Sequence, residues 1–322
     1  MLPKPQHRHT FEGIGTRWSI ETLHPLDDSV IEVIAVTVER YDQTWSRFRG
    51  DSDIAALRTA GATITLPPES KRLSELYRAL YTLTRGSMTP LVGSSLEAIG
   101  YGADYDLGAN GAVSAAPAWE DALLWEGTSA RSRQGITLDI GAAGKGQLVD
   151  LLGAVLLDAG IEDWIIDGSG DFKHHGEIAA TSVALEHPRQ PGIAIGKLEL
   201  ANRAFAASAG NRRAWGEGLH HILDASTGEP TSDVLGTWVI ADTAIDADAL
   251  ATALFFAPAR DLRRGFTFEY ARMYASGHLE TSGVFSGSFF TRSNPAPRPV
   301  QRETPDSTAP VTDPPFSTEA NS

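Results

Sequence analysis

The chain has 322 residues, 42% of them hydrophobic, which is enough to bury a sizeable core or two closely joined lobes. The formal net charge is −14 and no Lys/Arg cluster is present, so nucleic acid is not an expected partner. The absence of cysteine excludes disulfides, thiolate metal sites and a cysteine nucleophile.

The two ends of the chain differ in composition from its body. Residues 1–10 lack the apolar core of a signal peptide, and no apolar run approaches the roughly 20 residues that span a bilayer. We therefore expect a flexible N-terminus, a cytoplasmic protein and no transmembrane segment. From residue 291 to 322, prolines stand among Ser, Thr, Asp and Glu, which predicts a disordered tail. Residues 11–290 are left as the folded domain.

The first third of the chain predicts one strand and three helices. Residues 10–22 are expected to form a strand around a Gly-Ile-Gly-Thr segment. Apolar residues at helical spacing predict a helix over 28–43. A short helix is expected to begin near Asp51–Asp53 and to end at Gly61, and another covers 69–85. Residues 87–93 have the composition of a loop.

A glycine-rich turn follows the next predicted strand. Residues 136–140 alternate as a strand does, residues 141–146 read Gly-Ala-Ala-Gly-Lys-Gly, and a helix is expected over 147–158. This order aims backbone N–H groups at an anion. It is not a Walker A loop, because the spacing is too short and no Ser or Thr follows Lys145. A phosphate site and a simple tight turn both remain open.

The later segments complete an α+β pattern. A buried strand at 164–166 ends in Asp-Gly-Ser-Gly-Asp, but Phe172 and Ile178 occupy the positions where an EF-hand needs glycine and glutamate. We expect a loop held by its own side chains instead. Further strands are predicted at 181–186, 192–196, 203–208, 267–274 and 282–290, and a helix at 259–264. Without a βαβ rhythm, the chain is α+β rather than doubly wound.

The stretch from His220 to Thr252 carries the strongest chemical signal. A histidine pair and a Thr-Gly-x-Pro turn precede a strand and a helix. Within that helix, Asp248 and Thr252 are four residues apart and lie on one face. A carboxylate and a hydroxyl on a rigid element suit Mg²⁺ and a phosphate-bearing ligand. The alternative is that the aspartates only cap the helix.

Taken in order, these segments resemble the ApbE family of FAD:protein FMN transferases. The matching blocks are Phe-Glu-Gly-Ile-Gly-Thr at 11–16, Trp-Ser-Arg-Phe with Asp-Ser-Asp-Ile at 45–54, Leu-Asp-Ile-Gly-Ala-Ala-Gly-Lys-Gly at 138–146, Gly-Ser-Gly-Asp at 168–171, Ala-Ser-Ala-Gly at 207–210, His-His-Ile-Leu-Asp with Thr-Gly-Glu-Pro at 220–230, and Ala-Asp-Ala-Leu-Ala-Thr at 247–252. The resemblance implies mixed and antiparallel sheets with flanking helices.

The resemblance also implies a reaction and its residues. FMN would move from FAD to a Thr or Ser hydroxyl of an acceptor protein, with release of AMP. Asp248 and Thr252 would bind Mg²⁺ with the carbonyl of Ala142, and His221 would act as acid or base. FAD contacts are expected from a set spread along the chain: Ile14, Phe48, Ser87, Met88, Thr89, Asp139, Lys145 and Ile222, with Ser208 as a loop residue that bonds adenine or backbone.

The chain departs from the family pattern at three positions. Thr89 stands where an aspartate is expected, Ala209 replaces a glycine, and Ala225 replaces a proline. Two alternatives follow: water could replace the protein hydroxyl, which would make the chain a FAD pyrophosphatase, or the chain could be a non-catalytic FAD-binding protein. A metal-dependent phosphatase would need more carboxylates close together. We expect His220 to be structural or exposed, in contrast to His221.

Overall fold

The structure is a computed structural model that describes residues 2–102, 114–210, 214–215 and 219–290. One compact unit runs from Met1 to Phe289, and a second begins at Phe290. The predicted disordered tail, residues 291–322, lies outside the described residues.

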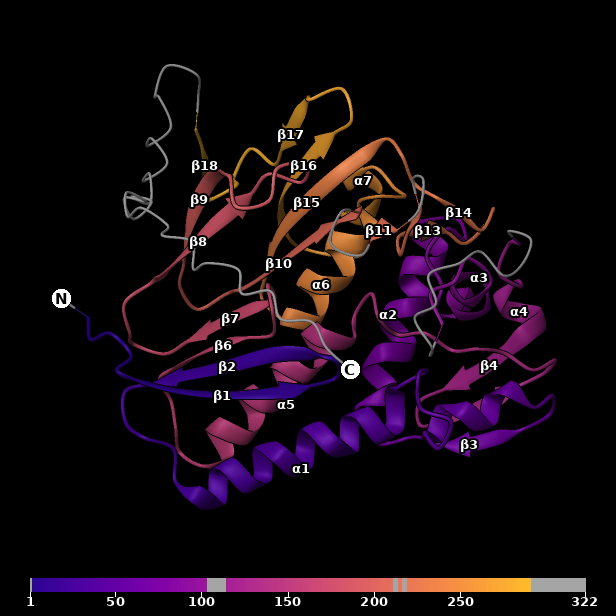
Figure 1. Cartoon of the computed structure of the whole chain (residues 1–322), viewed down its shortest axis with the longest axis horizontal. Helices are drawn as coiled ribbons and strands as arrows, with labels where there is room; N and C mark the ends of the chain where they lie inside the picture. The colour runs from indigo at the N-terminus through magenta and orange to yellow at the C-terminus, as the bar shows by residue number, and fades with distance from the viewer. Residues whose placement is uncertain (1, 103–113, 211–213, 216–218, 291–322) are drawn as a thin grey trace, which may run out of the picture. The chain divides into compact units, whose positions relative to one another are not determined.

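The centre of the first unit is an eight-stranded sheet in the order β1-β2-β6-β7-β10-β15-β16-β17 (Figure 1). Each neighbouring pair runs antiparallel. The strands are β1 His7–Gly13, β2 Thr16–Thr22, β6 Trp164–Asp167, β7 Phe172–His175, β10 Ala204–Ala209, β15 Val234–Ala241, β16 Glu269–Tyr274 and β17 Leu279–Thr281. β1 thus begins inside the segment that was predicted to be a flexible N-terminus.

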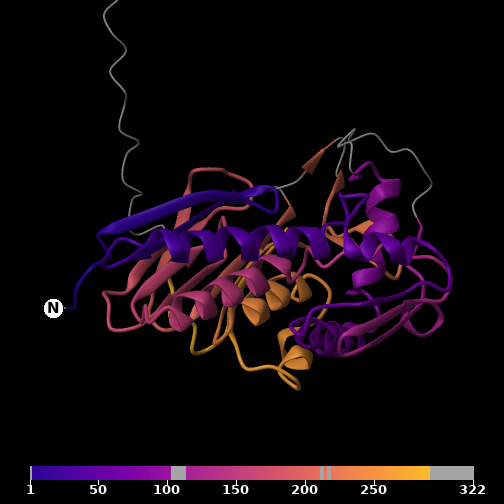
Figure 2. The ribbon, with the colours of Figure 1, turned by 90° about the horizontal axis from the view of Figure 1, so that it is seen from below.

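Helices cover one face of this sheet, and a smaller sheet covers the other (Figures 1 and 2). α5, Gly144–Asp158, and α6, Ala244–Ala253, pack side by side on the helical face, and α1, Asp28–Trp45, lies along α5. The second face packs against a sheet in the order β18-β9-β8, formed by Ser288–Phe289, Ala194–Leu200 and Thr181–Glu186.

Alternation along β10 and β15 produces these two layers. Phe205, Trp238 and Ile240 belong to the core under β8 and β9. Ala206 and Val239, one residue out of phase with them, belong to the core under the helices. Successive side chains of a strand point to opposite faces, so these two strands are buried on both sides.

The remaining elements form a region beside the sheet. A three-stranded sheet, β3-β5-β4, consists of Thr63–Thr65, Ser129–Ser132 and Leu123–Glu126. The helices of the chain that are not yet named are η1 Asp53–Arg58, α2 Ser70–Leu83, η2 Pro90–Val92, α3 Gly93–Ala98, α4 Trp119–Ala122 and α7 Ala259–Leu262, where η denotes a 3-10 helix. Two short hairpins pair β11 with β12 (Ala214–Trp215, Leu219–His220) and β13 with β14 (Leu223–Asp224, Glu229–Pro230).

The α+β prediction is confirmed, but two predicted strands differ. Residues 10–22 form parts of two strands joined by a tight turn, because Ile14 and Gly15 both have positive φ angles, 44° and 73°, which suit a two-residue hairpin. Residues 136–140 are not a strand. Their alternation reflects burial of Ile136, Leu138 and Ile140, while their backbone bonds to Leu57 and Pro90 instead of a neighbouring strand.

Two further elements have boundaries that differ from the predicted ones. α5 begins at Gly144, so the last three residues of the glycine-rich turn are helical. In the region predicted as a strand from 282 to 290, only Ser288–Phe289 pair, with β9. Among the described residues, no helix is both long enough and apolar enough to cross a membrane. The expected cytoplasmic location stays a prediction.

Candidate functional site

The start of α5 packs closely against one face of α6. Oδ2 of Asp248 accepts a hydrogen bond from the backbone N–H of Gly146 at 3.0 Å. A Cβ at Gly146 would lie 2.2 Å from the carbonyl oxygen of Ala244 and 2.8 Å from Cβ of Asp248. Only glycine therefore permits this contact, which joins the glycine-rich turn to the helix that carries Asp248.

A second carboxylate holds the beginning of α6. Oδ1 of Asp150, on α5, accepts the backbone N–H of Ala244 at 3.1 Å, and Oδ2 accepts that of Ile245 at 3.0 Å. Nζ of Lys173 donates to the same Oδ1 at 2.5 Å. A negative charge at a helix N-terminus is favourable because the first N–H groups have no partner within the helix. Asp150 thus fixes α6 in position relative to α5.

No aspartate is the N-cap of α6, although Asp246 lies in its first turn. The N-cap is Thr243, which accepts the N–H of Asp246, and Asp246 itself pairs with Arg72. Asp248 is 4% exposed and bonds to α5, not to the start of its own helix. Its role is therefore different from that of a cap.

Thr252 lies on the same helical face as Asp248 and meets β10. Its Oγ1 lies 3.5 Å from the hydroxyl oxygen of Ser208. Both side chains are half-buried. The predicted carboxylate and hydroxyl ligands on α6 are thus accompanied by a second hydroxyl, from the sheet.

Two buried tyrosines lie near Asp248. Burial raises the pKa values of Tyr41 and Tyr77 well above their usual value, and the charge of Asp248 raises both further. The backbone N–H of Ala142 also lies near the Tyr77 hydroxyl, which places Ala142 in the same neighbourhood. Burial is the first cause of both shifts, so these pKa values show that Asp248 lies near two buried phenols.

The donor atoms of the predicted metal ligands indicate which kind of cation they would bind. Among the described residues, no group of three or more His, Cys, Asp or Glu is arranged to hold a metal. A carboxylate, a hydroxyl and a carbonyl are hard oxygen donors, and a Mg²⁺ ion usually completes such a set with water and substrate phosphates. The residues present fit that kind of site.

Lys145 and the turn after β6 lie on a neighbouring side of α5. Nζ of Lys145 pairs with Oδ2 of Asp171, which is 1% exposed. The turn is held by Oδ1 of Asp167, which accepts the N–H of Gly170 at 2.9 Å, and by the Ser169 hydroxyl, which donates to the carbonyl of Arg17 at 2.7 Å. The predicted loop with its own side-chain hydrogen bonds is confirmed.

Asp139 connects to a group of rings through Arg47. Oδ1 of Asp139 accepts the N–H of Gly141 at 2.6 Å, and Oδ2 pairs with the buried guanidinium of Arg47. That guanidinium lies 4.1 Å from the ring centroid of Phe48 and 4.9 Å from that of Tyr101. Arg47 therefore joins two predicted FAD contacts, because it forms an ion pair with Asp139 and a cation–π contact with Phe48.

The two histidines have different surroundings. Nδ1 of His220 accepts the N–H of Ile222 at 3.2 Å, so Nε2 donates to the carbonyl of Thr231 at 2.8 Å. Burial lowers the pKa of His220 and favours this neutral, structural ring. The His221 ring lies 6.4 Å from the ring of Tyr101, centroid to centroid. His221 is thus adjacent to the rings that Arg47 stacks on.

The histidines also lie beside the end of β10. A Cβ on Gly210 would approach the His220 ring to 3.2 Å. Gly210 follows Ser208 by two residues, and Ser208 contacts Thr252. The contacts therefore lead from His220, through β10, to α6.

Hydrogen bonds to neighbouring segments hold the loop at 87–89. Met88 and Thr89 are buried, and the carbonyl of Ser87 accepts the N–H of Ala225 at 3.0 Å. The Thr89 hydroxyl accepts the N–H of Leu91 at 3.3 Å and caps η2. Thr and Asp are both common N-cap residues, so the exchange at this position keeps a local structural role.

Ile14 and Ile222 are the predicted FAD contacts not yet described. Ile14 is half-buried in the turn between β1 and β2. The hydroxyl of Thr16, at the start of β2, donates to the hydroxyl oxygen of Ser169 at 2.7 Å, so the turn after β6 contacts the start of β2. Ile222 is buried, its N–H bonds to His220, and its carbonyl accepts the N–H of Thr231 at 3.1 Å. Their contact with FAD stays a prediction.

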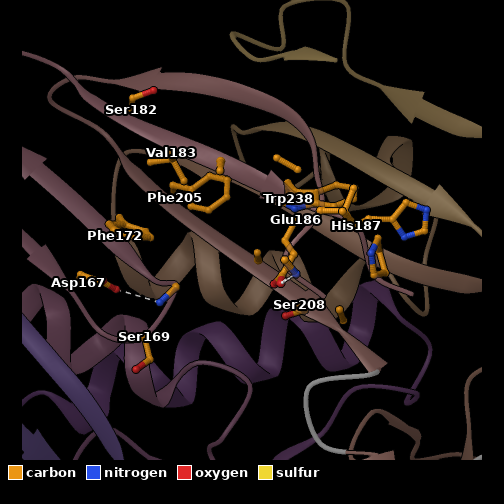
Figure 3. A pocket seen from close by; sticks show the side chains of 18 residues that line it. Asp167, Ser169, Phe172, Ser182, Val183, Glu186, His187, Phe205, Ser208 and Trp238 are labelled. Atoms are coloured by element: carbon orange, nitrogen blue, oxygen red, sulfur yellow. Dashed lines mark hydrogen bonds between the residues drawn. The ribbon is translucent and has the colours of Figure 1, made fainter. Parts of the chain in front are cut away.

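A cavity of about 570 Å³ opens beside Ser208 (Figure 3). Its walls come from the turn after β6, from β8 and β9, and from β10 and β15. Of the predicted FAD contacts, Ser208 alone lines it.

Sequence reasoning missed Arg47 and did not assign a role to Asp150. Arg47 stands between Ser46 and Phe48 in a block that was noted for its aromatic residue, and no local pattern indicates that its guanidinium is buried on Asp139. Asp150 lies four residues after the matching block at 138–146, and a carboxylate seven residues into a helix does not by itself indicate which helix it caps.

Comparison with known proteins agrees with this geometry. A model of the ApbE family matches residues 14–269. A FAD:protein FMN transferase of Rhodobacter capsulatus is 28% identical over 281 residues, which are 81% of this chain and 53% of that protein. A FAD:protein FMN transferase of Vibrio cholerae is 25% identical over 246 residues, 73% of each chain. The chain thus spans about half the length of the first relative.

Solved structures share the fold. The ApbE protein of Thermotoga maritima has a TM-score of 0.75 at 22% identity, over 86% of this chain and 97% of that one. The flavin transferase ApbE of Vibrio cholerae has a TM-score of 0.71 at 18% identity, over 87% and 99%. At these identities the likeness shows a common fold, and it confirms the predicted mixed and antiparallel sheets with flanking helices.

Proposed function

The chain belongs to the ApbE family, and from this premise we propose that it transfers FMN from FAD to a Thr or Ser hydroxyl of an acceptor protein and releases AMP. The names of the relatives support the reaction class. The observation that carries the proposal is the junction of α5 and α6, where Gly146 donates to Asp248 and Lys145 stands one residue away.

The α5–α6 junction suits a diphosphate. The ammonium of Lys145 is a donor for phosphate oxygens. Four backbone N–H groups of the turn are already bonded within the protein, those of Gly141, Ala143, Gly144 and Gly146. In this proposal Lys145 exchanges part of its contact with Asp171 for a contact with FAD. Asp171 is almost fully buried, so it keeps Lys145 oriented toward the turn before FAD arrives.

A Mg²⁺ ion would be held by Asp248, Thr252 and the carbonyl of Ala142. When bound, it would neutralise the charge that develops on the diphosphate during transfer. Asp248 is fixed by Gly146, and Asp150 fixes the start of its helix. A carboxylate held in this way needs little rearrangement when its ligand arrives.

The nucleotide would extend from this junction toward the rings. Asp139 is oriented by Gly141 and Arg47, so its oxygens have fixed directions. Phe48 is half-buried and supported from behind by Arg47 and by Tyr101 at 5.8 Å, edge to face. A supported ring of this kind is suited to contact a flat heterocycle.

His221 would take the proton of the attacking hydroxyl. An unperturbed imidazole accepts a proton near neutral pH, and the neighbouring His220 is committed to backbone groups by both ring nitrogens. The hydroxyl oxygen forms a bond to the FMN-side phosphorus, the bond from that phosphorus to the bridging oxygen breaks, and AMP leaves with that oxygen.

The hydrolytic alternative differs only in the nucleophile. If water attacks, the products are FMN and AMP and no protein is modified. The non-catalytic alternative was motivated by Thr89, and the capping role of Thr89 weakens that motive because the loop keeps its local bond.

The experiment is to incubate the chain with FAD and Mg²⁺ in the presence of a pool of synthetic peptides, each with one central threonine. We expect peptides that gain FMN, seen by mass spectrometry, together with AMP. Free FMN and AMP with unmodified peptides would favour the pyrophosphatase, and intact FAD would favour the non-catalytic binder.

A further inference from the structure

The eight-stranded sheet has an opening beside β10. This strand pairs with β15 along its whole length, from Ala204 to Ala209. On its other side it pairs with β7 only at Ala204 and Phe205, because the chain that precedes Phe172 turns back toward β6. From Ala206 to Ala209 the β7 side of the strand has no strand partner within the described parts of the chain.

The cavity of about 570 Å³ lies over this opening. Ser169 and Gly170, in the turn after β6, line one wall, and the strand residues Ala207, Ser208 and Ala209 line the wall across from it. Figure 3 shows Phe172, Val183 and Phe205 gathered at one end and Trp238, Glu186 and His187 at the other. The cavity thus offers a strand edge together with space for side chains.

The cavity and the predicted reaction site lie on opposite faces of β10, and consecutive residues of this strand reach each of them. Alternation along β10 directs Ser208 toward α6, where its hydroxyl lies 3.5 Å from that of Thr252. Ala207, the next residue, is exposed and lines the cavity. A molecule that lies along β10 would therefore pass directly beside the predicted metal ligands.

FAD itself has other expected contacts. The positions that were predicted to touch it, Ser208 excepted, lie outside the cavity walls. The cavity is thus left for the second substrate. An unpaired strand edge binds an extended peptide through main-chain hydrogen bonds, and pockets on one face receive alternate side chains.

We propose that an extended segment of the acceptor protein binds here by pairing with the edge of β10 at Ala206–Ala209, in line with β7. One apolar side chain of this segment would enter the cavity, and its reactive Thr or Ser would lie beside Thr252. This proposal rests on the proposed function. The docked hydroxyl oxygen bonds to the FMN-side phosphorus of FAD, its proton goes to His221, and AMP departs with the bridging oxygen.

The test is Ala207→Phe, which fills the cavity from an exposed position. Transfer of FMN to the threonine peptide pool should fall by about tenfold or more in kcat/KM. FAD affinity, measured by quenching of flavin fluorescence, should stay at the wild-type value. Ile193→Glu, on the exposed connection between β8 and β9, tests the opposite wall without touching β10 and should give the same pattern.

A control and three results decide the proposal. Ala35→Phe places the same side chain on the exposed surface of α1 and should transfer at the wild-type rate. Wild-type transfer in both cavity variants would overturn the docking site, and so would weakened FAD binding, which would assign the cavity to the nucleotide. If the wild-type chain itself modifies no peptide, the proposed function fails first, and the docking site falls with it.

Discussion

Gly146 donates its backbone N–H to the carboxylate of Asp248 at 3.0 Å, so the glycine-rich turn and the helix of the predicted metal ligands form a single unit. α5 can approach α6 this closely only because residue 146 has no Cβ. The glycine-rich turn and the carboxylate are thus fixed relative to each other before any ligand binds, as the proposed transfer site requires.

Replacement of Gly146 by alanine should separate the two helices. The new Cβ meets backbone atoms of Ala244, which cannot move as a flexible side chain would. We expect a loss of about 1–3 kcal/mol in the free energy of unfolding, measured by urea denaturation, and a large loss of FAD turnover. Gly50→Ala is the control, because nothing lies within 4 Å of its added Cβ. Equal stability of the two variants would contradict the close-packing argument.

Asp248→Asn keeps the shape of the side chain and removes its charge. FAD turnover should fall by roughly a thousandfold, because a neutral amide binds a divalent cation poorly. Asp246→Asn, two residues earlier, removes a carboxylate that pairs with Arg72, and it should retain most of the activity. The rates are compared over a titration of Mg²⁺. A variant of Asp248 with the wild-type response to Mg²⁺ would rule out a ligand role.

Asp150→Ala should loosen the start of α6. Two backbone N–H groups lose their acceptor and Lys173 loses its partner, so we expect a destabilisation of about 1–2 kcal/mol with a rise in the Mg²⁺ concentration needed for half-maximal turnover. Lys173→Met removes the ion pair but leaves the cap, and it should change both quantities less. A larger effect from the lysine variant would assign the role to the ion pair instead.

Arg47→Met should weaken FAD binding. The variant keeps an apolar side chain against Phe48 and Tyr101 but leaves Asp139 without its guanidinium partner. We expect KM for FAD to rise by about tenfold while kcat changes less, because Arg47 positions binding residues and does not touch the predicted reacting atoms. Arg40→Met, at an exposed position of α1, is the matched control. An unchanged KM would show that Asp139 needs no such support.

The loss of folding stability at acidic pH should depend on Glu280. Burial would raise the pKa of this carboxyl, but hydrogen bonds from Tyr270, Tyr274 and Arg272 outweigh burial and lower the pKa from 4.5 to about 2. The lowered pKa means that the stabilisation is complete above about pH 4.5 and is lost as the pH falls toward 2. Arg272 also donates to the carbonyls of Leu254 and Ala257, just after α6.

Glu280→Gln should therefore be less stable than the wild-type chain at neutral pH and should lose less stability between pH 4.5 and 2. Urea denaturation at a series of pH values measures this difference. Glu199→Gln, an exposed carboxylate near Lys197, should follow the wild-type curve. Parallel curves for wild type and Glu280→Gln would contradict the pKa assignment.

Local patterns predicted most of the helices and the helical position of Asp248 and Thr252, but not the contacts between distant segments. The spacing of Asp248 and Thr252 placed both on one face because helical geometry is local. The strand predicted at 136–140 is wrong because alternating apolar residues can also be buried in a segment that pairs with no neighbouring strand. The pairing of Arg47 with Asp139 joins residues 92 positions apart, and no single-sequence pattern reports a contact of that range.

The most direct measurement of the central claim is the ratio of AMP released to FMN attached covalently to a threonine acceptor. The account predicts one AMP for each attached FMN, with both products absent for Asp248→Ala. AMP accompanied by an equal amount of free FMN, with no attached flavin, would contradict the transfer and identify the chain as a FAD pyrophosphatase.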